Sequence, residues 1–271
     1  MKEKLRSLSM RSVLVSAAGR GFYHALDDYK RQTAAKKWRR DRTAAIQAYL
    51  GAHVVRKLQL GAGGNVLTGW LNSDISPPNS NVSFLDAREP FPFGDYTFDY
   101  IFCEHLMEHL CYLEGQSALR ECYRVLKCCG KVRIATPNLN NILALSTAAK
   151  GGIQEKYVRW SNAEFGPHLD SHLPGFVLNN FFRLWGHEFI YDADTMELTL
   201  RTTGFSGFRW FAVGESEDDN LRNIEGHGRC IGEEMNRVET MVVEATRPQP
   251  ARLPSAPGQP RVGLTPSHDP R

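Results

Sequence analysis

A glycine turn followed by an acid is the part of this sequence that most directly suggests chemistry. The stretch LQLGAGGNVLTGWLNSD covers residues 58–74, with Gly61, Gly63 and Gly64 directly after an apolar segment and Asp74 at the end of the next one. A glycine turn lets a ligand approach the backbone closely, and an acid after the second strand can accept hydrogen bonds from both hydroxyls of a ribose. The pattern predicts a nucleoside site at the carboxyl edge of a parallel sheet.

The spacing within this stretch argues against a dinucleotide. The G-x-G-x-x-G pattern is incomplete, and only 11 positions separate Gly63 from Asp74, whereas a dinucleotide site has about 20 residues between its motif and its acid. A full helix hardly fits into this interval, and a pyrophosphate depends on a helix N-terminus for its charge. The short connection therefore favours a ligand without a phosphate and disfavours a nicotinamide-dependent oxidoreductase.

The strands and helices that position this turn can be predicted from the pattern of apolar residues. Apolar runs predict strands, and helical spacing of apolar residues predicts the helices between them. The expected strands are 54–60, 70–74, 82–86, 98–104, 131–136, 208–213 and 241–246, and the expected helices are 116–126 and 192–203. Strands that alternate with helices indicate an α/β fold with a mostly parallel sheet covered on both faces.

Composition divides the chain of 271 residues into three parts. We expect a basic helical arm over 1–50, a main domain over 51–246 with an inserted lid or substrate module over 138–190, and a disordered Pro-rich tail over 247–271. The insert is rich in aromatics, His and Asn and shows no clean strand. No apolar run approaches the roughly 20 residues that a membrane span needs, so we expect a cytoplasmic protein.

The charge is unevenly distributed. Residues 1–42 contain 12 Lys or Arg against 4 acids, a local charge of +8, while the whole chain carries +3. This arm could contact an anionic membrane surface or an acidic protein; the alternative is a solvated helical face. No aromatic-interleaved motif supports a nucleic-acid partner. The six cysteines form no CxxC pair, which is typical of free thiols in a reducing cytosol.

Four blocks of the sequence resemble the class I S-adenosylmethionine-dependent methyltransferases, in particular the type 11-like group associated with glycan and secondary-metabolite genes. They are KLQLGAGGNVLTGWLNSDI, FLDAREPFPFGDYTFDYIFCEHLMEHL, ALRECYRVLKCCGKVRIATPNL and the late TTGF. The resemblance implies a Rossmann-like fold with a seven-stranded sheet. It also implies methyl transfer from S-adenosylmethionine by in-line displacement to a small-molecule or glycan acceptor, with a hydroxyl expected. An inactive binding subunit of a biosynthetic assembly is the alternative, and the oligomeric state stays open.

The resemblance also assigns cofactor-binding residues. It makes Gly61, Ala62 and Gly63 the backbone cradle for the methionine part of the cofactor. It implies that Asp74 holds the ribose hydroxyls and that Asp86 and Ala87 lie at the adenine edge. Glu104 and His105, at the mouth of the fourth strand, would lie beside the methyl-bearing sulfur. The residues in chain order are Leu60, Gly61, Ala62, Gly63, Asp74, Ile75, Asp86, Ala87, Glu104 and His105.

An acceptor hydroxyl usually needs a base, and histidine has the side chain whose ordinary pKa is nearest neutral pH. The candidates for this base are His105, His168 and His172, whereas we interpret His109 as a structural histidine. The run His168-Leu-Asp-Ser-His172 has alternating ligand types, but we expect it to bind acceptor or to be a plain loop, and we predict no metal. We expect the aromatics of the insert to form its core: Trp160, Phe165, Phe176, Phe181, Phe182 and Trp185.

Overall fold

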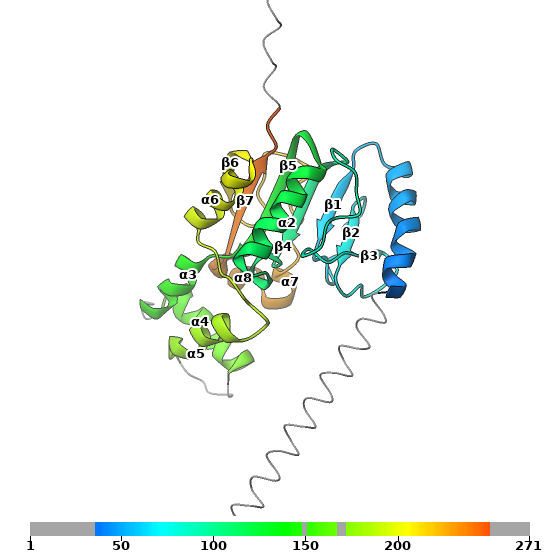
Figure 1. The fold of residues 1–271 in the computed structure, drawn as a ribbon. Helices are drawn as coiled ribbons and strands as arrows, with labels where there is room; N and C mark the ends of the chain where they lie inside the picture. The colour runs from blue at the N-terminus through cyan, green and yellow to red at the C-terminus, as the bar shows by residue number, and fades with distance from the viewer. Residues whose placement is uncertain (1–35, 148–150, 167–171, 250–271) are drawn as a thin grey trace, which may run out of the picture.

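The computed structural model describes residues 36–147, 151–166 and 172–249. It contains a seven-stranded sheet in the order β3-β2-β1-β4-β5-β7-β6 (Figure 1). The strands are β1 (Lys57–Leu60), β2 (Leu71–Asp74), β3 (Val82–Phe84), β4 (Phe98–Glu104), β5 (Leu126–Pro137), β6 (Ser206–Phe211) and β7 (Thr240–Thr246). Strands β1 to β5 pair in parallel, and β7 is antiparallel to both β5 and β6. The predicted α/β, mostly parallel sheet is confirmed.

Helices cover one face of this sheet. Helix α2 (Tyr112–Val125), α6 (Ala193–Thr203) and the helix over residues 36–52 contribute to one apolar cluster with the sheet. Alternate residues of the strands belong to the two faces, since Ile101 lies in this cluster and Phe102 in the cluster on the other side. The connection between β6 and β7 supplies Leu221 and Ile224 to that second cluster. A long loop thus covers this face where the sequence predicts helices.

The connection between β1 and β2 has no helix. Residues 61–70 form turns and extended chain only. Leu58 of β1 pairs with Leu71 of β2 and with Ile101 of β4, so the three strands end at one edge. The short spacing read from the sequence is therefore real, and the glycine turn lies directly at the carboxyl ends of the parallel strands.

The insert after the fifth strand has a small core of its own. It contains α3 (Leu139–Ala144), η2 (Leu145–Thr147), α4 (Ile153–Phe165) and α5 (Pro174–Arg183). Its apolar cluster includes Tyr157, Val177 and Phe181, and Met235 joins from α8 (Glu233–Glu239). The insert lies beyond the carboxyl edge of the sheet, beside α7 (Gly228–Ile231) and α8 (Figure 1). Among the described residues, no helix has both the length and the apolar character of a membrane span.

Candidate active site

The glycine turn and its acid are in direct contact. The backbone N–H of Gly63 donates to Oδ2 of Asp74 at 2.9 Å, and the N–H of Ser76 donates to Oδ1 at 2.7 Å. A carboxylate has about four acceptor positions, so Asp74 can still accept from a ligand. The same acid that is expected to bind the ribose also fixes the turn beside it.

Two glycines of the turn have conformations that favour glycine. Gly61 and Gly63 have φ values of +65° and +48°, in the left-handed region where a side chain is costly. A Cβ on Gly61 would also lie 3.2 Å from Cδ1 of Leu106, whereas a Cβ on Gly63 would meet nothing within 4 Å. Open space over Gly63 is what a ligand lying against the backbone requires.

Six of the ten predicted cofactor residues line one hollow, which we call the cofactor hollow. Its walls come from the ends of β1 and β2, the segment after β3 and the turn after β4. They are Leu60, Gly61, Asp74, Ile75, Leu85, Asp86, Ala87, Arg88, Leu106, His109 and Leu110. The predicted site residues from the first three strands are thus brought together.

Asp86 has a partner that the sequence analysis did not include. The Arg88 guanidinium donates from Nε to Oδ1 and from Nη2 to Oδ2, both at 2.9 Å. Burial opposes ionisation of Asp86, but the hydrogen bonds and charge of Arg88 outweigh it and lower the pKa of this carboxyl. Asp86 therefore presents an ion pair, and not a free carboxylate, to the cofactor hollow.

Glu104, which is predicted to lie beside the sulfur, also has partners within the fold. Its carboxylate accepts the backbone N–H groups of Gly226 at 2.8 Å and His227 at 2.9 Å. It also accepts, at 3.2 Å, from Nδ2 of Asn65, a residue that follows the glycine turn. Glu104, the last residue of β4, thus ties the loop after β6 to the glycine turn, and most of the acceptor positions of its carboxylate are used.

A second hollow, the connecting hollow, lies between the glycine turn and this late loop. It contains the remaining predicted cofactor residues except Gly63. Its walls are Gly61, Ala62, Gly64, Asn65, Glu104, His105, Gly226, His227, Arg229 and Cys230. Gly61 belongs to both this hollow and the cofactor hollow, so the two are neighbours along the turn.

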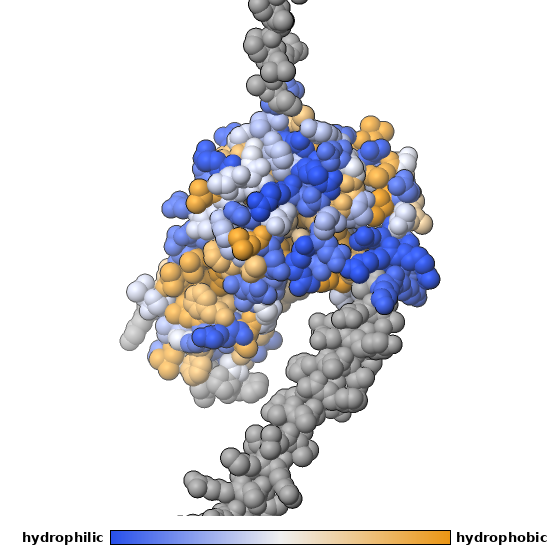
Figure 2. Space-filling view, in the orientation of Figure 1, coloured by the Kyte–Doolittle hydropathy of each residue, from blue (hydrophilic) through white to orange (hydrophobic). Residues whose placement is uncertain are grey.

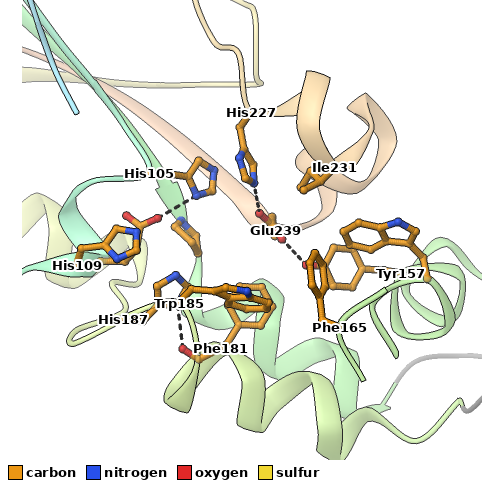
Figure 3. Close-up of a pocket in the computed structure, with 13 residues that line it drawn as sticks. His105, His109, Tyr157, Phe165, Phe181, Trp185, His187, His227, Ile231 and Glu239 are labelled. Carbon is orange, nitrogen blue, oxygen red and sulfur yellow. Dashed lines mark hydrogen bonds and ion pairs between the residues drawn. The ribbon is translucent and has the colours of Figure 1, made fainter. Parts of the chain in front are cut away.

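The third hollow, the acceptor hollow, is walled by the insert (Figure 3). Aromatic side chains cover one side, and histidines and acids cover the other. Its lining residues are His105, Glu108, His109, Pro137, Tyr157, Trp160, Phe165, Phe181, Trp185, His187, His227, Ile231 and Glu239. His105 and His227 line this hollow and the connecting hollow alike. The acceptor hollow and the connecting hollow therefore meet at these two histidines.

The aromatics of the insert divide into three groups, which corrects the expectation that all are core. Phe181 is buried in the small apolar cluster and also faces the acceptor hollow. Trp160, Phe165 and Trp185 line the hollow. Phe176 and Phe182 are exposed, since α5 is amphipathic and has an outer apolar edge. Figure 2 shows apolar residues gathered over α4 and α5.

His105 occupies its predicted position, but both of its ring nitrogens have partners. Nδ1 lies 2.9 Å from Oε1 of Glu108, and Nε2 lies 3.2 Å from Oγ1 of Thr240. Burial opposes protonation of His105, but the charge of Glu108 outweighs it and raises the pKa of the imidazole. Burial likewise opposes ionisation of Glu108, yet His105 lowers the pKa of that carboxyl. Both shifts favour the charged pair of imidazolium and carboxylate.

Of the other two predicted bases, only His172 belongs to the described residues. His168, together with Asp170 of the suggested metal motif, lies outside the described residues. His172 is exposed before α5 and does not line the acceptor hollow. The insert instead contributes His187, whose Nδ1 lies 2.9 Å from the carbonyl oxygen of Phe181 and whose pKa is lowered mainly by burial.

The sequence analysis missed His227, Glu239 and Tyr157. Nε2 of His227 lies 3.1 Å from Oε1 of Glu239, and the hydroxyl of Tyr157 donates to Oε2 of the same acid. One local signal was present, because His227 lies between Gly226 and Gly228 in a long loop. Two glycines around a histidine indicate close backbone packing, but they do not indicate what the ring contacts.

Comparison with known proteins agrees with this arrangement. Residues 58–134, from β1 to β5, match a family model described as a methyltransferase domain. The seven-stranded sheet of this chain, with an antiparallel β7, is the Rossmann-like architecture that the resemblance to the class I methyltransferases implies. No curated protein sequence matches the chain.

Three of the solved structures to which this chain is similar are described as methyltransferases. An S-adenosylmethionine-dependent methyltransferase from Archaeoglobus fulgidus is 19% identical, with 80% of this chain and 94% of that chain covered and a TM-score of 0.44. A possible histamine N-methyltransferase from Thermotoga maritima is 17% identical, with 73% and 87% covered and a TM-score of 0.41. Phosphoethanolamine N-methyltransferase 2 of Haemonchus contortus, solved with S-adenosyl-L-methionine, is 14% identical, with 77% and 53% covered and a TM-score of 0.40.

Proposed function

We propose that the chain is an S-adenosylmethionine-dependent methyltransferase that acts on a hydroxyl of a small-molecule or sugar acceptor. The observation that carries the proposal is the contact between the three hollows. Gly61 joins the cofactor hollow to the connecting hollow, and His105 and His227 join the connecting hollow to the acceptor hollow. A donor held along the glycine turn and an acceptor held under the insert would thus meet at these two histidines.

The residues of the cofactor hollow fit the proposed cofactor. Asp74 would accept from the ribose hydroxyls, and the backbone at Gly61 and Gly63 would lie against the methionine part. The apolar side chains of Ile75 and Leu110 would cover the adenosine part. When bound, S-adenosylmethionine supplies a methyl group on a sulfonium, so the difficult part of the chemistry belongs to the cofactor. The protein has to orient the acceptor and exclude water.

The acceptor hollow favours a molecule with one apolar face and one polar edge. Trp160, Phe165 and Trp185 offer flat apolar surfaces, while the opposite wall carries histidines and Glu239. Aromatic faces bind the apolar face of a ring, and the imidazoles and carboxylate bind hydroxyls. A sugar ring or an aromatic alcohol combines these two surfaces.

The basic arm suggests a second contact. Lys36 and Lys37 are exposed on the helix 36–52, while Arg39 pairs with Glu89 and Arg40 pairs with Asp41. Figure 2 shows hydrophilic residues gathered at this end of the helix. We propose an anionic partner, a membrane surface or a protein, for this arm, because clustered cations attract such surfaces over about a Debye length.

Calorimetric titration tests the proposed function. We expect the purified protein to bind S-adenosylmethionine and S-adenosylhomocysteine at micromolar concentration and to bind NAD much more weakly. Mass-spectrometric screening of sugars and aromatic alcohols for a gain of one methyl group would then identify the acceptor. Absence of binding by both sulfur compounds would refute the enzyme and leave the inactive binding subunit.

A further inference from the structure

We infer that His227, oriented by Glu239, is the general base that takes the proton of the acceptor hydroxyl, in place of His105. This inference rests on the proposed function and names the proton acceptor of the same site. It follows from the hydrogen bonds of the two stacked imidazoles, whose ring centroids are 3.8 Å apart.

The first step concerns His105, which has no lone pair to offer. Its Nδ1 lies 2.9 Å from Oε1 of Glu108, in an ion pair whose angle is outside hydrogen-bond geometry. The carboxylate can only accept, so this contact is favourable only when the nitrogen carries a hydrogen. Its Nε2 faces Oγ1 of Thr240, and the Thr240 hydroxyl donates its own hydrogen to Oδ1 of Asn236 at 2.7 Å. Thr240 can therefore only accept from His105. Both ring nitrogens of His105 are donors, and an imidazolium cannot take a further proton.

The buried surroundings of Glu108 hold this state in place. The Glu108 side chain is fully buried, and its second oxygen accepts from the hydroxyl of Thr136 at 3.0 Å. A buried carboxylate needs a positive partner or donors to offset its lost hydration. His105 supplies that charge, so its proton belongs to the structural ion pair.

His227 differs from His105 because only one of its ring nitrogens faces an acceptor among the described residues. Its Nε2 faces Oε1 of Glu239, and Tyr157 donates to the other oxygen of that carboxylate. Since Glu239 accepts on both sides, Nε2 of His227 carries the hydrogen. Among the described residues Nδ1 has no hydrogen-bond partner, so nothing in the fold requires a hydrogen there and Nδ1 can keep its lone pair. Glu104 holds the backbone N–H of His227 at 2.9 Å, and Glu239 holds the ring.

The position of His227 fits the role of a base. It lines both the connecting hollow and the acceptor hollow, and Figure 3 shows its ring facing Glu239 across from the aromatic wall. A carboxylate that orients an imidazole also stabilises the imidazolium that forms during proton transfer. Glu239 is buried and already hydrogen-bonded to Tyr157, so it can serve as this orienting group.

The reaction step balances with these groups. The acceptor oxygen forms its new bond to the methyl carbon as the bond from that carbon to the sulfonium sulfur breaks, and the electron pair of the broken bond stays on sulfur. The hydroxyl proton passes to Nδ1 of His227, whose positive charge is then balanced by Glu239. The products are the methyl ether, a neutral thioether and an imidazolium that later returns its proton to water.

A metal ion is the competing explanation for the same side chains. His105, His227 and Glu239 offer ligand atoms that all lie within 4.8 Å of one another. The two imidazole rings are stacked with an interplanar angle of 31°, however, and both nitrogens of His105 are donors. Metal ligands need converging lone pairs, so the observed geometry favours proton transfer.

Nitrogen NMR of the full chain labelled with ¹⁵N-histidine tests the inference without an acceptor. We expect both ring nitrogens of His105 to carry hydrogen, and we expect the neutral form of His227 to carry its hydrogen on Nε2. His105→Gln and His227→Gln assign the two signals, and Glu239→Gln should disturb the tautomer of His227 only. A His227 that carries hydrogen on Nδ1, or a neutral His105 with a lone pair, would overturn the assignment.

Two further measurements separate the possible outcomes. Tight one-to-one binding of Zn²⁺ that shifts both signals and is lost in both Gln variants would replace the base with a metal site. With an acceptor from the screen, His227→Gln should lower kcat by about 10²- to 10⁴-fold while calorimetric binding of S-adenosylmethionine stays within about twofold. His53→Gln, at the opposite edge of the sheet, is the matched control and should keep full kcat. A His227 variant with unchanged kcat refutes the base alone, whereas a wild-type protein that binds no cofactor refutes the proposed function.

Discussion

Replacing Asp74 tests the cofactor site most directly, because this acid has both a structural and a ligand-binding task. Asp74 accepts from the N–H groups of Gly63 and Ser76 in the folded chain, and the ribose hydroxyls would add hydrogen bonds to the same carboxylate. A hydrogen bond to a charged group contributes about 1.5 to 3 kcal/mol. The loss of such an interaction with the ligand predicts binding that is about 10- to 100-fold weaker in Asp74→Ala.

The loss of the two backbone contacts predicts a separate effect on stability. An unpaired backbone N–H costs about 1 to 3 kcal/mol when it is buried, but Asp74 is only half-buried, so water offsets part of this cost. Thermal melting measures the stability effect, and calorimetric titration with S-adenosylmethionine measures the binding effect. Asp74→Asn keeps one oxygen as an acceptor and should give an intermediate affinity.

Asp219→Ala provides the control for a surface acid, since its side chain is 89% exposed in the loop after β6. It should bind the cofactor with the affinity of the wild type. Cofactor binding by Asp74→Ala that equals the wild type, in a variant that melts as a folded protein, would refute the role of Asp74 at the ribose. Equal losses in both variants would show that the effect is not specific to this site.

Three other perturbations have defined outcomes. Gly61→Ala, at a φ of +65°, should cost about 1 to 2 kcal/mol of stability and weaken cofactor binding, and a variant with wild-type melting and calorimetry would contradict the geometry. The raised pKa of His105 means that its ion pair with Glu108 stabilises the fold fully below about pH 6.5, the ordinary histidine pKa. This contribution is lost as the pH rises through the folded-state pKa of His105. Urea unfolding over a pH series should therefore show a smaller loss of stability at alkaline pH for Glu108→Gln than for the wild type, and parallel curves would refute the pairing. Deleting residues 248–271 should leave Tm within about 2 °C of the wild-type value, and a large drop would show that the tail docks on the domain. Arg247→Ala loses guanidinium hydrogen bonds to the carbonyls of Arg124 and Leu126. This variant should lose about 2 kcal/mol of stability, and its Tm should fall by about 4 to 8 °C.

The strands and the glycine turn could be predicted because their signals are local. The apolar runs that ended at Leu60, Asp74 and Glu104 became β1, β2 and β4 with nearly the expected ends. A parallel sheet brings the carboxyl ends of its strands to one edge, so residues that follow those runs had to meet. Strand β5 begins five residues earlier than expected, because Leu126 already pairs with Phe98.

The polar partners could not be predicted, since they depend on segments far apart in the sequence. The contact of Glu104 with Gly226 spans 122 positions, and that of Tyr157 with Glu239 spans 82 positions. A carboxylate at a strand end looks the same in sequence whether it binds a ligand or a backbone N–H. The ion pair of Asp86 with Arg88 and the hydrogen bonds of Glu104 to the late loop were therefore not predicted from the sequence.

The sequence by itself determined where the cofactor hollow would be, because the glycine turn, the short interval and the acid at Asp74 all lie within 17 consecutive residues. Only the tertiary structure decided which histidine keeps a lone pair. His105 follows β4 as predicted, yet Glu108 and Thr240 occupy both of its nitrogens. His227 reaches the same place from the loop before α7, where Glu239 fixes its tautomer. The protonation state of an imidazole depends on the groups around it in space, and these groups come from distant parts of the chain.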